Sequence, residues 1–169
     1  ARIVEAQGGS QDSILAALRS AYERDTLNTA VMRSLASKYQ ARTDTSNLLD
    51  MLKRILTIDF RDNELRINTI RLLVQMGQVD SAIALVNQGL KENPASAELL
   101  GVKALAMAAA SRWDSAAVAM IQVAEIDSSK ADSLFFYRLT NYLRQVPDTA
   151  GYVTWVRNAT AKFPTQPPY

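Results

Sequence analysis

The segment from Gly77 to Pro94 limits the fold of this chain more than any other part of its sequence. Gly77 can adopt the backbone angles that end one helix, and Asp80 is a residue type that caps the start of the next. Ala82 is small enough to let two helices approach closely, and Pro94 cannot continue a helix. The segment therefore predicts two helices joined by a tight turn, with a second helix boundary at Pro94.

The composition favours helix along the rest of the chain. With 169 residues, 48% of them hydrophobic, the chain can bury a sizeable core. It has only 6 glycines and 5 prolines, and long alternating β-branched runs are missing. The 19 basic and 17 acidic residues leave a net charge of +2 and are mixed along the chain. We therefore expect an all-α protein with no nucleic-acid partner.

Two residue types that carry much of enzyme and metal chemistry are absent, because the chain has no cysteine and no histidine. Carboxylate pairs such as Asp59 and Asp62 stand where helices end, which favours capping over catalysis. We expect no catalytic residue, no metal and no cofactor. The most apolar window, Leu99 to Ala110, contains Lys103 and is shorter than a membrane span of about 20 residues, so no transmembrane segment is expected. The lack of cysteine fits a cytoplasmic and a periplasmic protein equally.

A spacing of 34 residues recurs on both sides of this segment. Residues 29–62, 63–96 and 97–130 form three consecutive units in one register. A fourth unit fits as residues 133–164 when two residues are added around Ser128 to Asp132. This shift places Phe136, Leu139, Thr140 and Leu143 at buried positions, which a strict step would give to Arg138 and Asn141.

The joint spacing resembles the tetratricopeptide repeat, or TPR. The first full unit matches the first half of the family pattern with Met32, Leu35, Ala36 and Tyr39. Unit 63–96 matches the second half with Ala82, Gly89 and Pro94. It departs from the first half, because Arg66, Thr69 and Ile70 stand at positions 4, 7 and 8.

The resemblance implies an α–α superhelix, or solenoid, of about four TPR-like helix pairs with an N-terminal half repeat over residues 10–28. The repeat domain spans residues 10–164. It lies between a flexible N-terminal segment, residues 1–9, and an extended C-terminal tail, residues 165–169. Most aromatic residues are expected in the core, and Trp113, which stands in a helix turn, is expected to be partly exposed.

The resemblance also implies a binding surface, because the first helix of each TPR pair lines a concave groove. The groove positions are held by Arg33, Ser37, Gln40, Asn68, Arg71, Gln75, Leu105, Ala108, Tyr137, Arg138, Asn141 and Arg144. Arginine and asparagine suit an acidic or C-terminal peptide. The alternative is that they are ordinary solvated polar residues. We do not expect the carboxylate clamp of chaperone-binding TPR domains, because Glu98 stands at a clamp position and would repel a carboxylate.

Three functions follow from the resemblance, and all of them imply a protein or peptide partner. The first is a non-catalytic scaffold that binds a peptide or partner subunit through the groove. The second is a structural accessory subunit or assembly factor built into a larger complex, such as a membrane-associated complex of a bacterial envelope. The third, which the residues favour least, is the regulatory domain of a larger enzyme.

Overall fold

A computed structural model describes residues 11–146 and the separate positions 153, 154, 157 and 161. The described residues form eight α-helices and one short 3-10 helix, and no strand occurs among them. The predicted segments 1–9 and 165–169 lie outside the described residues, as do the expected turn at Pro147 and the boundary at Pro164. The prediction of an all-α fold of the solenoid class is confirmed for the part of the chain that the structure describes.

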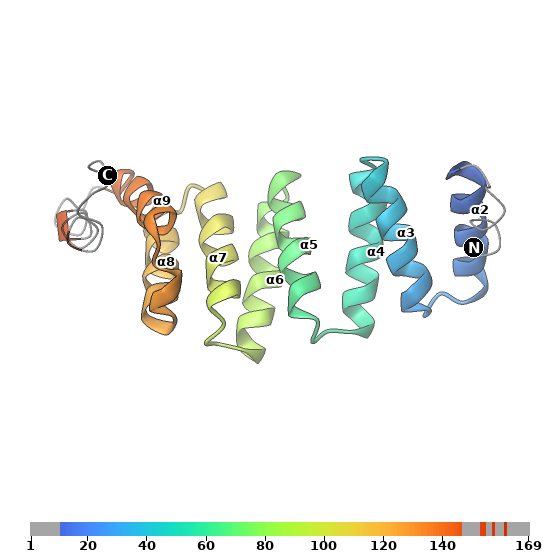
Figure 1. The fold of residues 1–169 in the computed structure, drawn as a ribbon, viewed down its shortest axis with the longest axis horizontal. Helices are drawn as coiled ribbons and strands as arrows, with labels where there is room; N and C mark the ends of the chain where they lie inside the picture. The colour runs from blue at the N-terminus through green and yellow to red at the C-terminus, as the bar shows by residue number, and fades with distance from the viewer. Residues whose placement is uncertain (1–10, 147–152, 155–156, 158–160, 162–169) are drawn as a thin grey trace. The chain divides into compact units, whose positions relative to one another are not determined.

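The chain separates into two compact units, residues 1–65 and 66–169, and their boundary falls within helix α5, Asn63–Gln75. In the first unit, α3 (Thr29–Ala41) packs against both α2 (Gln11–Arg24) and α4 (Thr45–Ile58) (Figure 1). Asn28 and Asp44 cap the starts of α3 and α4 through their side chains. Helix α2 buries Ile14, Leu15 and Leu18, as its apolar spacing predicts.

The second unit continues with α6 (Val79–Glu92), α7 (Ala97–Ala109), α8 (Trp113–Ile126), η1 (Ser128–Lys130) and α9 (Ser133–Arg144). Helix α7 contacts both α6 and α8, and α8 contacts α9 (Figure 1). One core cluster joins α7, α8 and α9. It consists of Ala97, Leu100, Ala104, Ala117, Ala119, Met120, Val123, Ala131, Phe135, Phe136, Leu139 and Leu143.

Three turns of one kind stand 34 residues apart, at Thr43, Gly77 and Ser111, and each has a positive φ, of 55°, 71° and 57° respectively. In each turn the N–H after the left-handed residue donates to the carbonyl five residues earlier, which closes the helix in a Schellman motif. These bonds are Asp44 to Tyr39 at 2.9 Å, Gln78 to Leu73 at 2.9 Å and Arg112 to Met107 at 2.8 Å. The turn predicted at Gly77 is confirmed, and the repeat forces the same backbone onto Thr43 and Ser111.

The predicted start of α6 is wrong. The N-cap residue is Gln78, which makes no side-chain capping hydrogen bond, and Asp80 lies inside the first turn. There its negative charge still interacts favourably with the helix dipole. The predicted end is confirmed, because α6 ends at Glu92 and the residue before Pro94 has an extended backbone with φ of −137°.

The fourth unit is offset by η1, which fills the link between α8 and α9. Asp132 then caps α9 by accepting a hydrogen bond of 2.7 Å from the N–H of Phe135. Phe136 and Leu139 are buried, whereas Arg138 is exposed. This burial agrees with the register shifted by two residues. The division of the chain into repeat units remains a prediction.

Arg66 is buried, with only 1% of its surface exposed, although its charge makes it a poor match to the family pattern. Its Nη2 lies 3.0 Å from Oε2 of Glu92, at the other end of the helix pair. Gly89 makes room for it, because a Cβ at Gly89 would lie 2.8 Å from the Cδ of Arg66. Thr69 and Ile70 are also buried. The helix therefore turns its expected face inward, and the departures at Arg66 and Gly89 complement each other.

Candidate functional site

The residues predicted to line a groove all lie on α3, α5, α7 and α9, the first helices of the predicted pairs. All of them are exposed except Ala108 and Asn141, which are half-buried. On each helix they recur at steps of three or four residues, so they share one face. Their role in binding remains a prediction, and the two units are described separately below.

In the first unit, Arg33 already has carboxylate partners in its own chain. Its Nη2 lies 2.8 Å from Oδ2 of Asp62 and 3.7 Å from Oδ2 of Asp59. Asp62 also accepts a hydrogen bond of 2.9 Å from the N–H of Leu65 and so caps α5. The Asp59 and Asp62 pair therefore serves helix ends and an ion pair. Arg33 ties α3 to the loop after α4, and a ligand carboxylate would have to compete with Asp62 for it.

In the second unit, three exposed arginines lie on first helices: Arg71 on α5, and Arg138 and Arg144 on α9. None of the three forms an ion pair with another described residue. Helix α7 adds an apolar surface, where Leu105 is exposed and a Cβ at Gly101 would meet no atom within 4 Å. The second unit thus combines unpaired positive charge with exposed apolar surface.

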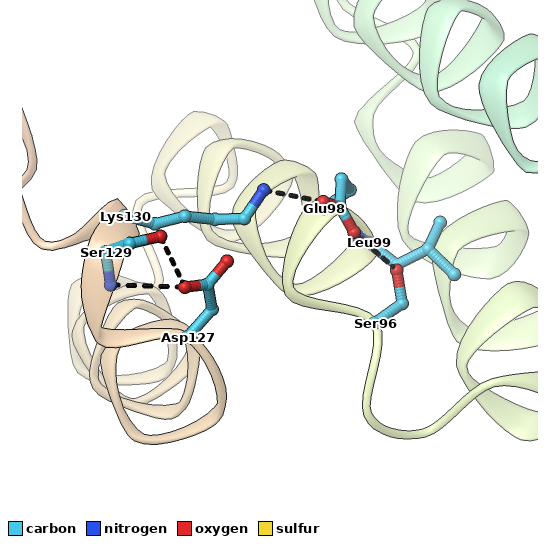
Figure 2. A network of polar contacts seen from close by, with 6 residues as sticks. All are labelled: Ser96, Glu98, Leu99, Asp127, Ser129 and Lys130. Carbon is cyan, nitrogen blue, oxygen red and sulfur yellow. Dashed lines mark hydrogen bonds and ion pairs between the residues drawn. The ribbon is translucent and has the colours of Figure 1, made fainter.

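Glu98, at the start of α7, is neutralised by a neighbour that the sequence did not indicate. Figure 2 shows its Oε1 accepting a hydrogen bond of 2.5 Å from Nζ of Lys130, in η1. This bond lowers the pKa of Glu98 and raises the pKa of Lys130. Ser96 caps α7, and Asp127 binds the N–H and hydroxyl of Ser129 (Figure 2). The carboxylate expected to repel an anionic ligand is therefore compensated within the chain.

Leu134 is an exposed apolar residue that the sequence reasoning missed. It lies on α9 three residues before Tyr137, and the two side chains are 52% and 56% exposed. An available signal was its position in the shifted register, where an apolar residue stands outside the core set. Trp113 is half-buried, and its ring packs against Tyr142 with centroids 6.1 Å apart.

The described residues were also searched for metal and membrane features. Within residues 11–146 and the four separate positions, no group of three or more potential ligand residues could hold a metal ion. None of the described helices has both the length and the apolar character that a bilayer crossing requires.

Comparison with known proteins confirms the resemblance proposed from the sequence. Residues 49–106 match the model of the tetratricopeptide repeat family. A search of curated protein sequences found no match. The solved structure of MamA from Desulfovibrio magneticus RS-1 is similar, with 12% identity, a TM-score of 0.70, and coverage of 95% of this chain and 90% of that chain.

Two further solved structures share the fold. YrrB, described as a TPR protein with an unusual peptide-binding site, has 17% identity and a TM-score of 0.71 over 98% of this chain and 84% of that chain. A TPR protein from Parabacteroides merdae has 15% identity and a TM-score of 0.71 over 98% of this chain and 64% of its own. This chain therefore has TPR sequence in its middle and a TPR-type fold.

Proposed function

We propose that this chain is a non-catalytic scaffold that binds a peptide or a partner subunit through the exposed faces of its first helices. The observation that carries the proposal is the pattern of charge and exposure in the second unit. Arg71, Arg138 and Arg144 are exposed and form no ion pair with another described residue. YrrB, which shares the fold, is described as having a peptide-binding site.

The chemistry of these side chains suits protein recognition. Arginine presents a planar fork to carboxylates, and Asn68 and Gln75, both exposed on α5, can donate to and accept from an extended main chain. Binding by such a surface depends on shape and charge and breaks no covalent bond. A protein or peptide is therefore the partner we propose, and no cofactor is needed.

Photo-crosslinking tests the face that binds. A benzoylphenylalanine placed at Gln40 or Gln75 samples the first helices, and the same residue at Gln88 or Gln122 samples the second helices; all four glutamines are exposed. We expect one discrete adduct, identified by mass spectrometry, from the first-helix positions after irradiation in cells that produce the chain natively. Adducts only from Gln88 and Gln122, or none at any of the four, would contradict the proposal.

A second candidate function is supported by apolar exposure in the first unit. Leu27 is 73% exposed and Phe60 is 47% exposed, and Ile58 at the end of α4 is exposed as well. Because α3 and α4 pack together and are joined by a tight turn, the start of α3 and the end of α4 face the same way. Exposed apolar residues that gather at one end of a unit are typical of an interface in a stable complex.

This accessory-subunit function has its own test. Native mass spectrometry of the chain isolated from its source would show a stoichiometric complex, and Leu27→Ser with Phe60→Ser would release the chain from it. A matched change, Val118→Ser on α8, removes a comparably exposed apolar residue from the other unit and should leave the complex intact. A chain that is isolated alone would exclude permanent assembly and leave the peptide-binding scaffold.

A further inference from the structure

We propose that the exposed face of α9, formed by Leu134, Tyr137, Arg138 and Arg144 and called here the α9 patch, binds an acidic protein segment that carries an apolar side chain. The inference rests on the proposed scaffold function and names the chemistry of its partner. Three features support it, namely exposed apolar surface, unpaired charge and a rigid base.

The apolar part of the α9 patch is large. Leu134 and Tyr137 are 52% and 56% exposed and stand one helical turn apart, so their side chains are neighbours on the helix surface. Covering them would remove apolar area from water, which stabilises a complex by about 25 cal/mol for each Å². Tyrosine and arginine are also the residue types that most often dominate binding energy at protein interfaces.

The charged part of the α9 patch has no acid to balance it. Helix α9 contains Arg138 and Arg144 and no aspartate or glutamate. The carboxylate that precedes the helix, Asp132, caps it by accepting from the N–H of Phe135. Glu98, on the neighbouring first helix, is bound to Lys130. The anionic groups that would complement these arginines must therefore come from a partner.

The opposite side of α9 holds the patch in place. Phe135, Phe136, Leu139 and Leu143 are buried in the core cluster shared with α7 and α8. A helix anchored in this way presents its exposed side chains with little ordering left to occur on binding, which favours affinity. The patch is thus a preorganised surface in the unbound chain.

The combination of groups selects a protein segment over a nucleic acid. A nucleic-acid surface gains most of its affinity from many basic residues along a stripe, whereas α9 supplies two arginines and the whole chain has a net charge of only +2. A phosphate backbone would also leave Leu134 uncovered. An acidic segment with a leucine or phenylalanine satisfies both parts of the patch.

The test measures binding of the full chain to a defined probe by fluorescence anisotropy. The probe is a fluorescein-labelled peptide of twelve residues that repeats Glu-Leu-Glu. One control peptide has lysine for every glutamate, and another has serine for every leucine. We expect both control peptides to bind at least about tenfold more weakly, a difference of about 1.4 kcal/mol.

Variants of the chain separate the two parts of the patch. Arg138→Gln with Arg144→Gln, and separately Leu134→Ser with Tyr137→Ser, should each weaken binding of the acidic probe at least about tenfold. Two matched changes on α8, in its N-cap and in its exposed face, should leave it unchanged: Arg112→Gln and Val118→Ser. Circular dichroism of each variant shows that its helices are retained.

Three results would overturn the inference: no binding of the acidic probe, equal binding by the arginine variant, or tighter binding of a twelve-residue oligothymidine that is insensitive to Leu134→Ser. None of them bears on the photo-crosslinking result at Gln75. A first-helix adduct with a partner that lacks acidic segments would sink the α9 patch and leave the scaffold function standing.

Discussion

Gly89→Ala should destabilise the chain although alanine is the better helix former. In the interior of α6 the change gains about 0.5 to 1 kcal/mol of helix propensity. The new Cβ would lie 2.8 Å from Cδ of Arg66, 3.1 Å from its Nη1 and 3.1 Å from Cδ1 of Leu99. Overpacking of a buried site costs about 1 to 3 kcal/mol, and Arg66 has no exposed surface toward which to retreat. We therefore expect a net loss of about 1 kcal/mol.

The control for this change is Gly101→Ala in α7. A Cβ at Gly101 would meet nothing within 4 Å, so only the propensity gain of about 0.5 to 1 kcal/mol applies and the chain should become more stable. Urea unfolding followed by circular dichroism compares the two variants, which should differ by about 2 kcal/mol in free energy of unfolding.

Arg66→Leu completes the cycle. Replacing a buried ion-pair member by an apolar residue is often neutral for stability, and Glu92 keeps 35% of its side chain exposed to water. In the leucine background the cost of Gly89→Ala should fall by at least about 1 kcal/mol. If Gly89→Ala stabilises the natural chain as much as Gly101→Ala does, Gly89 is not what accommodates the arginine.

Three further predictions use the same unfolding assay. Thr43→Gly should stabilise the chain by about 1 kcal/mol, because φ of 55° strains a β-branched residue and suits glycine; an unchanged midpoint would show that the hydroxyl of Thr43, which donates to the carbonyl of Arg42, offsets the strain. Asp132→Ala should cost about 1 kcal/mol through loss of the α9 cap, whereas Asp80→Ala, which removes no cap, should change stability by less than about 0.5 kcal/mol. Glu98→Gln should cost at most about 1 kcal/mol, because both ends of its pair with Lys130 are exposed. The pKa of Glu98 is lowered and that of Lys130 is raised in the folded chain, so the difference from the natural chain should be present near pH 7 and vanish as the pH falls through the folded pKa of Glu98 or rises through that of Lys130; a difference that persists at pH 2 would contradict the ion pair as its cause.

The helices and their register could be predicted because their signals are local. Apolar residues three and four apart define a buried stripe, and Gly77 marks a turn. The rule that a charged residue avoids the core placed Arg138 outside and so set the register of α9. The same rule misjudged Arg66, because what makes its burial acceptable is Gly89 and Glu92, and Glu92 lies 26 residues later.

The candidate site was predictable in its exposure and not in its pairing. The first-helix positions follow from the repeat spacing, and most of them are exposed. Which charges remain available depends on partners far along the chain: Arg33 bonds to Asp62 across 29 residues, and Lys130 bonds to Glu98 across 32. No local pattern marks these pairs, so the sequence alone could not separate Arg33 from Arg138.

The contact between Arg66 and Gly89 also limits how this chain could exchange parts with itself. At a spacing of 34 residues, the positions of Arg66 and Gly89 correspond to Met32 and Ile55 in the preceding unit, both of them buried. A recombination breakpoint in the turn at Gly77 would join Arg66 to a helix with a bulky residue at the position of Gly89, or Met32 to a helix with a glycine there. The first product is overpacked and the second contains a cavity. Helices α5 and α6 must therefore be inherited as a pair, and duplications or designed chimeras should be cut between units.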